Sequence, residues 1–98
     1  MRPVLHGDVV SAARALLTVP ETARAEFCAT LIQRADMADK HCRQTGQVHV
    51  MWGNGSLMAA ARTHWLPSEP SFEDDTYCSC FEMVLQMLVN WRVSQRRN

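Results

Sequence analysis

The segment with the clearest potential for ligand chemistry is W-G-N-G-S-L, residues 52–57, which leads into a run of helix-forming residues. Backbone N–H groups at the N-terminus of a helix can bind a phosphate or a carboxylate. Trp52 and Trp65 flank the expected helix and offer rings on which a ligand could stack. A binding site for a small anion here would be formed by Trp52, Gly53, Asn54, Gly55, Ser56 and Trp65.

The same segment also fits a structural corner without a ligand. It lacks the P-loop and dinucleotide-binding patterns, and no Lys or Arg lies within six residues of its glycines. In this interpretation Gly53 and Gly55 supply unusual backbone angles. Asn54 or Ser56 then caps the next helix, and Trp52 fills the core beside the turn. The corner is the simpler interpretation, and the anion site is the alternative.

The cysteines and histidines do not follow the spacing of a structural zinc site. His41, Cys42 and His49 lie close together in the sequence. Cys78 and Cys80 lie at the start of the expected last helix, where residues two apart point about 200° away from each other. We therefore expect reduced cysteines that pack as small apolar side chains, with no metal site and no cofactor.

Catalytic chemistry has no recognisable motif in this chain, since neither a nucleophile elbow nor H-E-x-x-H is present. The acidic cluster Glu73, Asp74 and Asp75 suits the N-terminus of a helix, whose dipole favours negative charge. A nucleophilic pair such as Cys42 with His49 would need a lowered thiol pKa and a third, orienting group. The sequence indicates neither, so we expect a non-enzymatic protein with no catalytic residues.

Composition and charge argue against several other classes of protein. The 98 residues make one domain, in which ten basic side chains balance ten acidic ones. Nucleic-acid binding needs a concentrated basic surface, and the cluster Arg92, Arg96 and Arg97 has no basic run beside it. No apolar run approaches the roughly 20 residues that cross a bilayer, and the opening residues lack the apolar stretch of a signal peptide. We expect a cytoplasmic protein with no nucleic-acid or membrane partner.

Hydrophobic periodicity predicts an all-α single domain, residues 1–98, with helices at about 8–18, 19–45, 56–63 and 72–95. We expect the two long helices to pack antiparallel, with the short helices closing the ends and an irregular loop in the middle. Apolar stripes mark the two long helices: Phe27, Leu31, Ala35, Ala38 and Cys42 in one, and Tyr77, Phe81, Val84, Leu88 and Trp91 in the other.

Several residues carry helix-boundary signals. Asp8 is expected to cap the first helix. Thr18 and Glu21 form the sequence pattern of a capping box for the second helix, and Ser71 heads a similar pattern for the last. Gly46 is expected to end the second helix in a left-handed conformation.

The most natural function for these residues is binding through an apolar surface. Six methionines and three tryptophans supply large, adaptable apolar side chains. The last helix is apolar around much of its circumference, more than a small helical domain covers easily. We expect an interaction or adaptor protein that binds an unknown protein partner or itself, as a homodimer, through Met87, Leu88 and Trp91. The anion site at residues 52–56, backed by Trp65, is the alternative function.

The chain also resembles a small bacterial family of uncharacterised domains. The resemblance lies in the opening R-P-V-L-H-G-D, in W-G-N-G-S-L-M-A-A-A, and in the aromatic-cysteine start of the last helix. It implies a stand-alone soluble bacterial protein. It implies no activity, ligand or catalytic residue for any position of this chain.

Overall fold

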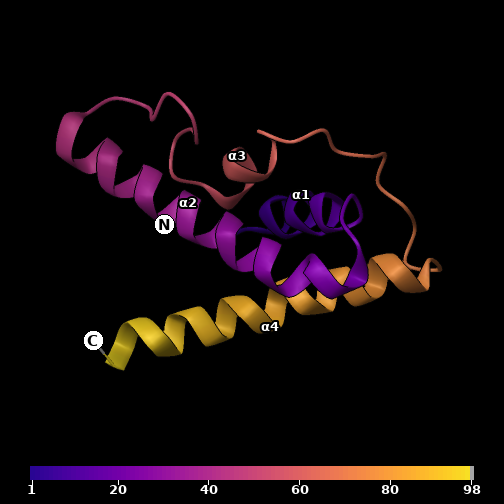
Figure 1. Ribbon diagram of the computed structural model, residues 1–98. Coiled ribbons are helices and arrows are strands. Elements are labelled where there is room, and N and C mark those ends of the chain that lie inside the picture. The colour runs from indigo at the N-terminus through magenta and orange to yellow at the C-terminus, as the bar shows by residue number, and fades with distance from the viewer. Residues whose placement is uncertain (98) are drawn as a thin grey trace.

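The computed structural model describes residues 1–97 and confirms the all-α fold class. Within these residues the chain forms four α-helices, and a 3-10 turn, η1, precedes the second (Figure 1). The only β pairing in the described part is an isolated bridge between His49 and Gly53. The helices are α1 (His6–Leu16), α2 (Arg24–Thr45), α3 (Leu57–Ala61) and α4 (Asp75–Arg97), with η1 at Glu21–Ala23.

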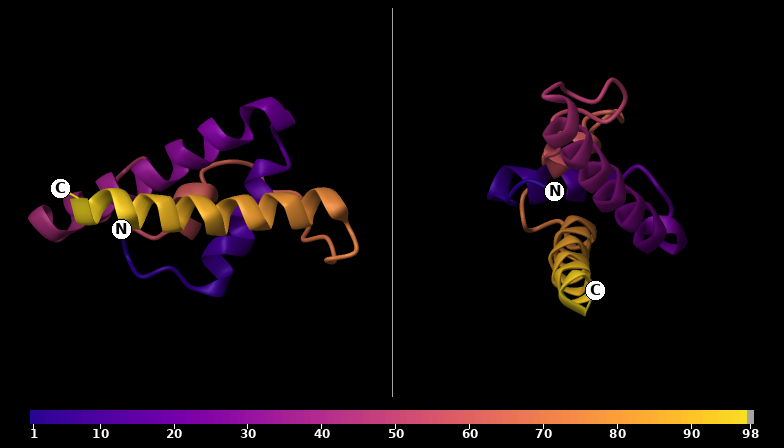
Figure 2. Two further views of the ribbon diagram at one scale, coloured as in Figure 1. Left: turned by 90° about the horizontal axis from the view of Figure 1, so that it is seen from below. Right: turned by 90° about the vertical axis from the view of Figure 1, so that its left-hand side faces the viewer.

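Helix α4 lies along one side of the molecule and packs against both α1 and α2, while α3 packs against α1 and α2 but not against α4 (Figure 2, right). The two long helices, α2 and α4, start at the same end of the molecule and run in the same general direction, as the views of Figures 1 and 2 agree. The antiparallel packing expected from the sequence is therefore wrong. The cause is the connection from 46 to 74, which includes α3 and leads the chain back to the end where α2 began.

The core is built mainly from small side chains where the helices meet. Seven alanines of α1, α2 and α3 are completely buried, and small residues let the helix backbones approach closely. Phe27 and Phe81 are partly buried and pack against this core, as the apolar stripes predict. The buried apolar residues are Val9, Ala12, Ala13, Ala15, Leu16, Cys28, Leu31, Ile32, Ala35, Ala38, Leu57, Ala60, Ala61, Tyr77, Cys80, Val84 and Leu88.

The start of α1 differs from the prediction. The helix begins at His6 with Leu5 in the capping position, so Asp8 lies inside the first turn rather than before it. Its carboxylate accepts a hydrogen bond from the Leu5 backbone N–H at 2.8 Å. The acidic side chain satisfies the helix end by reaching backward, which is the role of the third helical residue in a capping box.

The capping box predicted at Thr18 and Glu21 is also wrong. The Thr18 hydroxyl donates to the backbone carbonyl of Ala15 at 2.7 Å, so it closes the end of α1 instead of opening α2. Glu21 lies in η1, and α2 begins only at Arg24.

The later boundaries follow the predicted residues more closely. Gly46 ends α2 with φ of 71°, and the Ser56 hydroxyl caps α3 by accepting from the Ala59 N–H at 3.1 Å. Ser71 accepts from the Glu73 N–H at 3.3 Å, but α4 begins later, at Asp75.

The cap of α4 is Asp74, whose carboxylate accepts from the Tyr77 N–H at 2.9 Å. No helix in residues 1–97 has the length and hydropathy required to span a membrane.

Candidate functional site

The segment predicted as corner or anion site folds into a small closed loop before α3. His49 and Gly53 exchange two backbone hydrogen bonds, of 2.9 and 3.0 Å. Between them, Nδ1 of His49 accepts from the backbone N–H groups of Met51 at 3.0 Å and Trp52 at 3.2 Å. Gly53 has φ of 88°, a conformation that glycine adopts without strain. The imidazole and the glycine together fix the shape of this loop.

Gly55 brings the loop directly onto α2. Its φ is 97°, and a Cβ atom at this position would lie 2.7 Å from both Cα and Cβ of Asp39. The carbonyl of Gly55 accepts from the Arg2 N–H at 2.9 Å, so the first residues of the chain lie against the same place. Only a residue without a side chain fits between these backbones.

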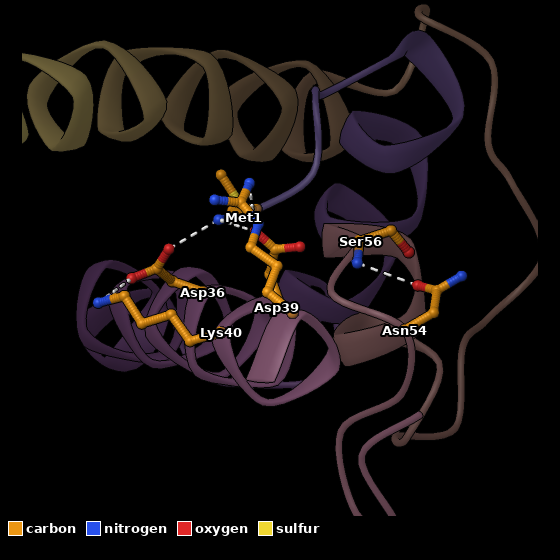
Figure 3. Close-up of polar contacts among 7 residues, drawn as sticks. Met1, Asp36, Asp39, Lys40, Asn54 and Ser56 are labelled. Atoms are coloured by element: carbon orange, nitrogen blue, oxygen red, sulfur yellow. Dashed lines mark hydrogen bonds and ion pairs between the residues drawn. The ribbon is translucent and has the colours of Figure 1, made fainter. Parts of the chain in front are cut away.

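An ion cluster lies around Asp36 and Asp39, and Asp39 is the residue that Gly55 approaches (Figure 3). The Met1 ammonium group is 2.7 Å from Oδ1 of Asp36 and 3.0 Å from Oδ2 of Asp39. Lys40 pairs with Asp36 at 3.1 Å, and Arg43 pairs with Asp39 at 2.9 Å. Three cationic groups thus surround two carboxylates. Each carboxylate already has cationic partners within the chain, which marks the cluster as structural.

The electrostatics of Asp36 reflect this arrangement. Burial raises the pKa of its carboxyl, but hydrogen bonds from the Met1 ammonium and from Lys40 lower it more. The net pKa therefore lies below the ordinary value of 3.8.

In the first turn of α3, the N–H groups of Met58 and Ala59 already have acceptors within the chain. The Met58 N–H donates to Oδ1 of Asp8 at 2.9 Å, and the Ala59 N–H donates to the Ser56 hydroxyl. The Ser56 N–H donates to the side-chain oxygen of Asn54 at 3.0 Å (Figure 3). Asp8 is only 6% exposed, so a buried carboxylate occupies the place that a bound anion was expected to take. A second anion there would meet this negative charge.

The two tryptophans predicted as a stacking wall do not form one. Trp52 stacks on the imidazole of His49, with ring centroids 4.7 Å apart, and the Arg34 guanidinium lies 5.8 Å from its ring centre. It is half-buried at the surface of α2 rather than in the core, contrary to its predicted role as a core plug. Trp65 is 78% exposed, beyond the other end of α3.

The cysteines are free thiols in two different environments. Cys28 and Cys80 are buried in the core, and burial together with the neighbouring Cys80 raises the pKa of Cys28 to about 11. Burial also raises the pKa of Cys80. Cys42 and Cys78 are partly exposed. Among residues 1–97 no three His, Cys, Asp or Glu side chains gather in a metal-binding arrangement.

The residues predicted as an interface occupy two different positions on α4. Leu88 is 2% exposed and belongs to the core. Met87 and Trp91 are partly buried and line one edge of a shallow groove of about 260 Å³ between α4 and α2, with Ala29 and Ile32 on the opposite edge. The groove is mainly apolar but open to solvent.

A second apolar row on α4 was not singled out in the sequence. Leu85, Val89 and Val93 are exposed by 47%, 49% and 37%. They are four residues apart and therefore share one face of the helix. Their spacing was readable from the sequence. However, α4 has apolar residues on nearly every side, so spacing alone does not tell which row is buried. The packing of α1 and α2 against α4 decides this, since Leu88 lies in the core whereas Leu85, Val89 and Val93 stay exposed.

Comparison with known proteins gives a family match, which covers most of the chain. No curated protein and no solved structure matches it. Residues 2–88 match a family described as a domain of unknown function, DUF7742. This match includes the loop at Gly55 and all of α1, α2 and α3, and it ends within α4 at Leu88. The chain therefore belongs to the DUF7742 family of domains of unknown function.

Proposed function

We propose that this protein is a non-enzymatic, cytoplasmic interaction domain that binds a protein partner through α4. The observation that supports this function is the exposed row Leu85, Val89 and Val93, which lies on the same helix as the half-buried Met87 and Trp91. Exposed apolar patches on a folded domain mark interaction surfaces. The free thiols of the four cysteines are the state that a reducing compartment maintains.

The rest of the molecule favours this choice over the anion site. Two backbone N–H groups of α3 that could bind an anion, those of Met58 and Ala59, already donate to Asp8 and Ser56. In contrast, Leu85, Val89 and Val93 keep a large part of their surface in water. Burying such side chains against a partner contributes free energy roughly in proportion to the apolar area removed from water. The α4 face is the better candidate because it has surface left to bury.

Photo-crosslinking in the cell of origin tests the proposal. A photoreactive phenylalanine derivative placed at Val89 is expected to form a covalent adduct of discrete mass with one protein. The same group at Gln33, an exposed position on α2, serves as the matched control and is expected to form none. Mass spectrometry then identifies the adduct. Equal labelling at both positions, or no adduct at Val89, contradicts an interaction function for α4.

A further inference from the structure

We infer that the partner of α4 is a second copy of this chain, bound through an antiparallel pair of α4 helices with Val89 at the two-fold axis. This inference rests on the proposed function and specifies the partner. Its basis is the pattern of one row of exposed residues: Glu82, Leu85, Val89, Val93 and Arg96.

This row is symmetric about its centre. Its successive spacings are 3, 4, 4 and 3 residues, so each position on one side of Val89 has a counterpart at the same distance on the other side. Spacings of three and four keep all five side chains on one face of the helix. The apolar residues are central, and the ends are acidic at Glu82 and basic at Arg96.

In an antiparallel two-fold pair of α4 helices, residues at equal distances on either side of Val89 lie opposite each other. In a two-fold interface the same patch is used twice, so each contact occurs in two equivalent copies. Val89 meets Val89 of the second copy, and Leu85 meets Val93. Glu82 then faces Arg96 of the second copy at each end of the row. A parallel pair would place like charges opposite each other, which is unfavourable.

The charged ends are available for such contacts. Glu82 and Arg96 are both exposed, and neither forms an ion pair with another residue within 1–97. The remaining residues of the row are exposed by 37% to 49%. An apolar centre flanked by opposite charges is the arrangement with which paired helices select their orientation.

The position of α4 in the fold permits close approach of a second copy. It forms the outer layer of the molecule, with the other three helices all on one side of it (Figure 2, right). The row from Glu82 to Arg96 spans about 21 Å along the helix axis at the usual rise of an α-helix. The exposed centre of this row, at Leu85, Val89 and Val93, is the part that a second α4 can approach.

Analytical ultracentrifugation over a wide range of concentration tests this pair. The wild-type chain is expected to pass from monomer to dimer as its concentration rises. Val89→Asp is expected to weaken dimerisation about tenfold or more, because it places two carboxylates together at the centre of the interface. Circular dichroism of each variant shows that the helices are retained, which an exposed position should allow.

Charge reversal tests the orientation. Glu82→Arg alone and Arg96→Glu alone are each expected to weaken the dimer, since each creates two like-charge contacts. The double variant E82R/R96E restores opposite charges at both ends and is expected to recover wild-type association. Arg97→Glu, next to the row but outside it, is the matched control and is expected to have little effect.

The outcomes separate this inference from the proposed function. A monomer at every concentration, together with a crosslink from Val89 to a different protein, overturns the second copy but leaves the interaction function standing. A dimer that E82R/R96E fails to restore overturns the antiparallel arrangement. A dimer that loses association on Val89→Asp and recovers in the double charge reversal supports the whole arrangement.

Discussion

Asp8 joins the N-termini of two helices, because Oδ1 of its carboxylate accepts from the Met58 N–H at 2.9 Å while Oδ2 accepts from the Leu5 N–H at 2.8 Å. One buried side chain thus accepts a hydrogen bond from a backbone N–H group at the start of α1 and from another at the start of α3. We predict that Asp8→Ala lowers the free energy of unfolding by about 2–4 kcal/mol, since it removes a cap and leaves two donors without acceptors. Urea denaturation followed by circular dichroism measures this change.

Asp8→Asn is the control for this prediction. The amide keeps one oxygen acceptor in nearly the same volume, so its cost should be clearly smaller than that of Asp8→Ala. Equal losses for the two variants would contradict a role based on hydrogen bonding and would point to side-chain volume instead.

The contact between Gly55 and Asp39 predicts a second stability change. Gly55→Ala adds a Cβ atom 2.7 Å from the Asp39 backbone and forces an alanine to keep φ of 97°. The two effects together should lower the free energy of unfolding by about 2–4 kcal/mol. Gly46→Ala is the matched control, because Gly46 also has a positive φ, of 71°, but a Cβ there meets nothing within 4 Å. We expect thermal or urea denaturation to show a loss of about 1 kcal/mol for this control.

The difference between the two glycine variants isolates the steric contact. If Gly46→Ala and Gly55→Ala cost the same, the loop at Gly55 does not lie tightly against α2. This result would contradict the close packing of Gly55 against α2. It would still agree with a preference for glycine at a positive φ.

The sequence predicted the fold class and the number of helices because these depend on local patterns. The apolar stripes through Phe27 and Phe81, the helix end at Gly46 and the cap at Ser56 all follow from residues within one or two helical turns. What the sequence did not predict depends on distant contacts. The second partner of Asp8 is Met58, which is 50 residues away, and no local rule identifies it.

Dependence on distant contacts also explains why the sequence left two interpretations of the W-G-N-G segment open. The W-G-N-G segment was predicted as a corner or an anion site, and the choice depends on whether another part of the chain supplies the acceptor for α3. Asp8 supplies it. On α4, local spacing does not distinguish Leu88, which is buried in the core, from Val89, which is 49% exposed. Both the face of α4 that contains Leu88 and the face that contains Val89 are apolar in sequence. Only the packing of the other helices therefore decides which of the two faces is exposed.

The ion pairs of Asp36 predict a dependence of stability on pH. The pKa of Asp36 in the folded state lies below its unfolded value of about 3.8, so the unfolded chain binds more protons as the pH falls. The stabilising contribution of Asp36 is therefore complete above the unfolded pKa and is lost as the pH falls through the folded pKa. We predict that Asp36→Asn removes this part of the acid dependence. Urea midpoints measured between about pH 5 and about pH 2 test it.

Lys40→Met is the control for the pH prediction. It removes one of the two cations that lower the pKa of Asp36 but keeps the Met1 ammonium contact, so the acid dependence should be reduced without vanishing. If the urea midpoint of Asp36→Asn depends on pH in the same way as that of the wild-type protein, the Asp36 carboxylate does not contribute to the acid dependence of stability.

The different burial of the four thiols predicts their reactivity. Thiolate is the reactive form, and the raised pKa of Cys28, about 11, leaves almost none of it at neutral pH. Cys80 is buried and has a raised pKa as well, whereas Cys42 and Cys78 are partly exposed. We predict that an aromatic disulfide reagent at neutral pH labels Cys42 and Cys78 first. Cys28 and Cys80 should react only as the protein unfolds, and mass spectrometry of the peptides identifies the labelled positions.

Denaturation by urea provides the control for thiol labelling, since all four cysteines should then react at similar rates. Asp8→Ala offers a second control, because a less stable fold opens more often and should speed the labelling of Cys28. Fast reaction of Cys28 in the stable wild-type protein would contradict its complete burial in the core. It would also remove the basis for treating these two cysteines as small apolar residues of the core.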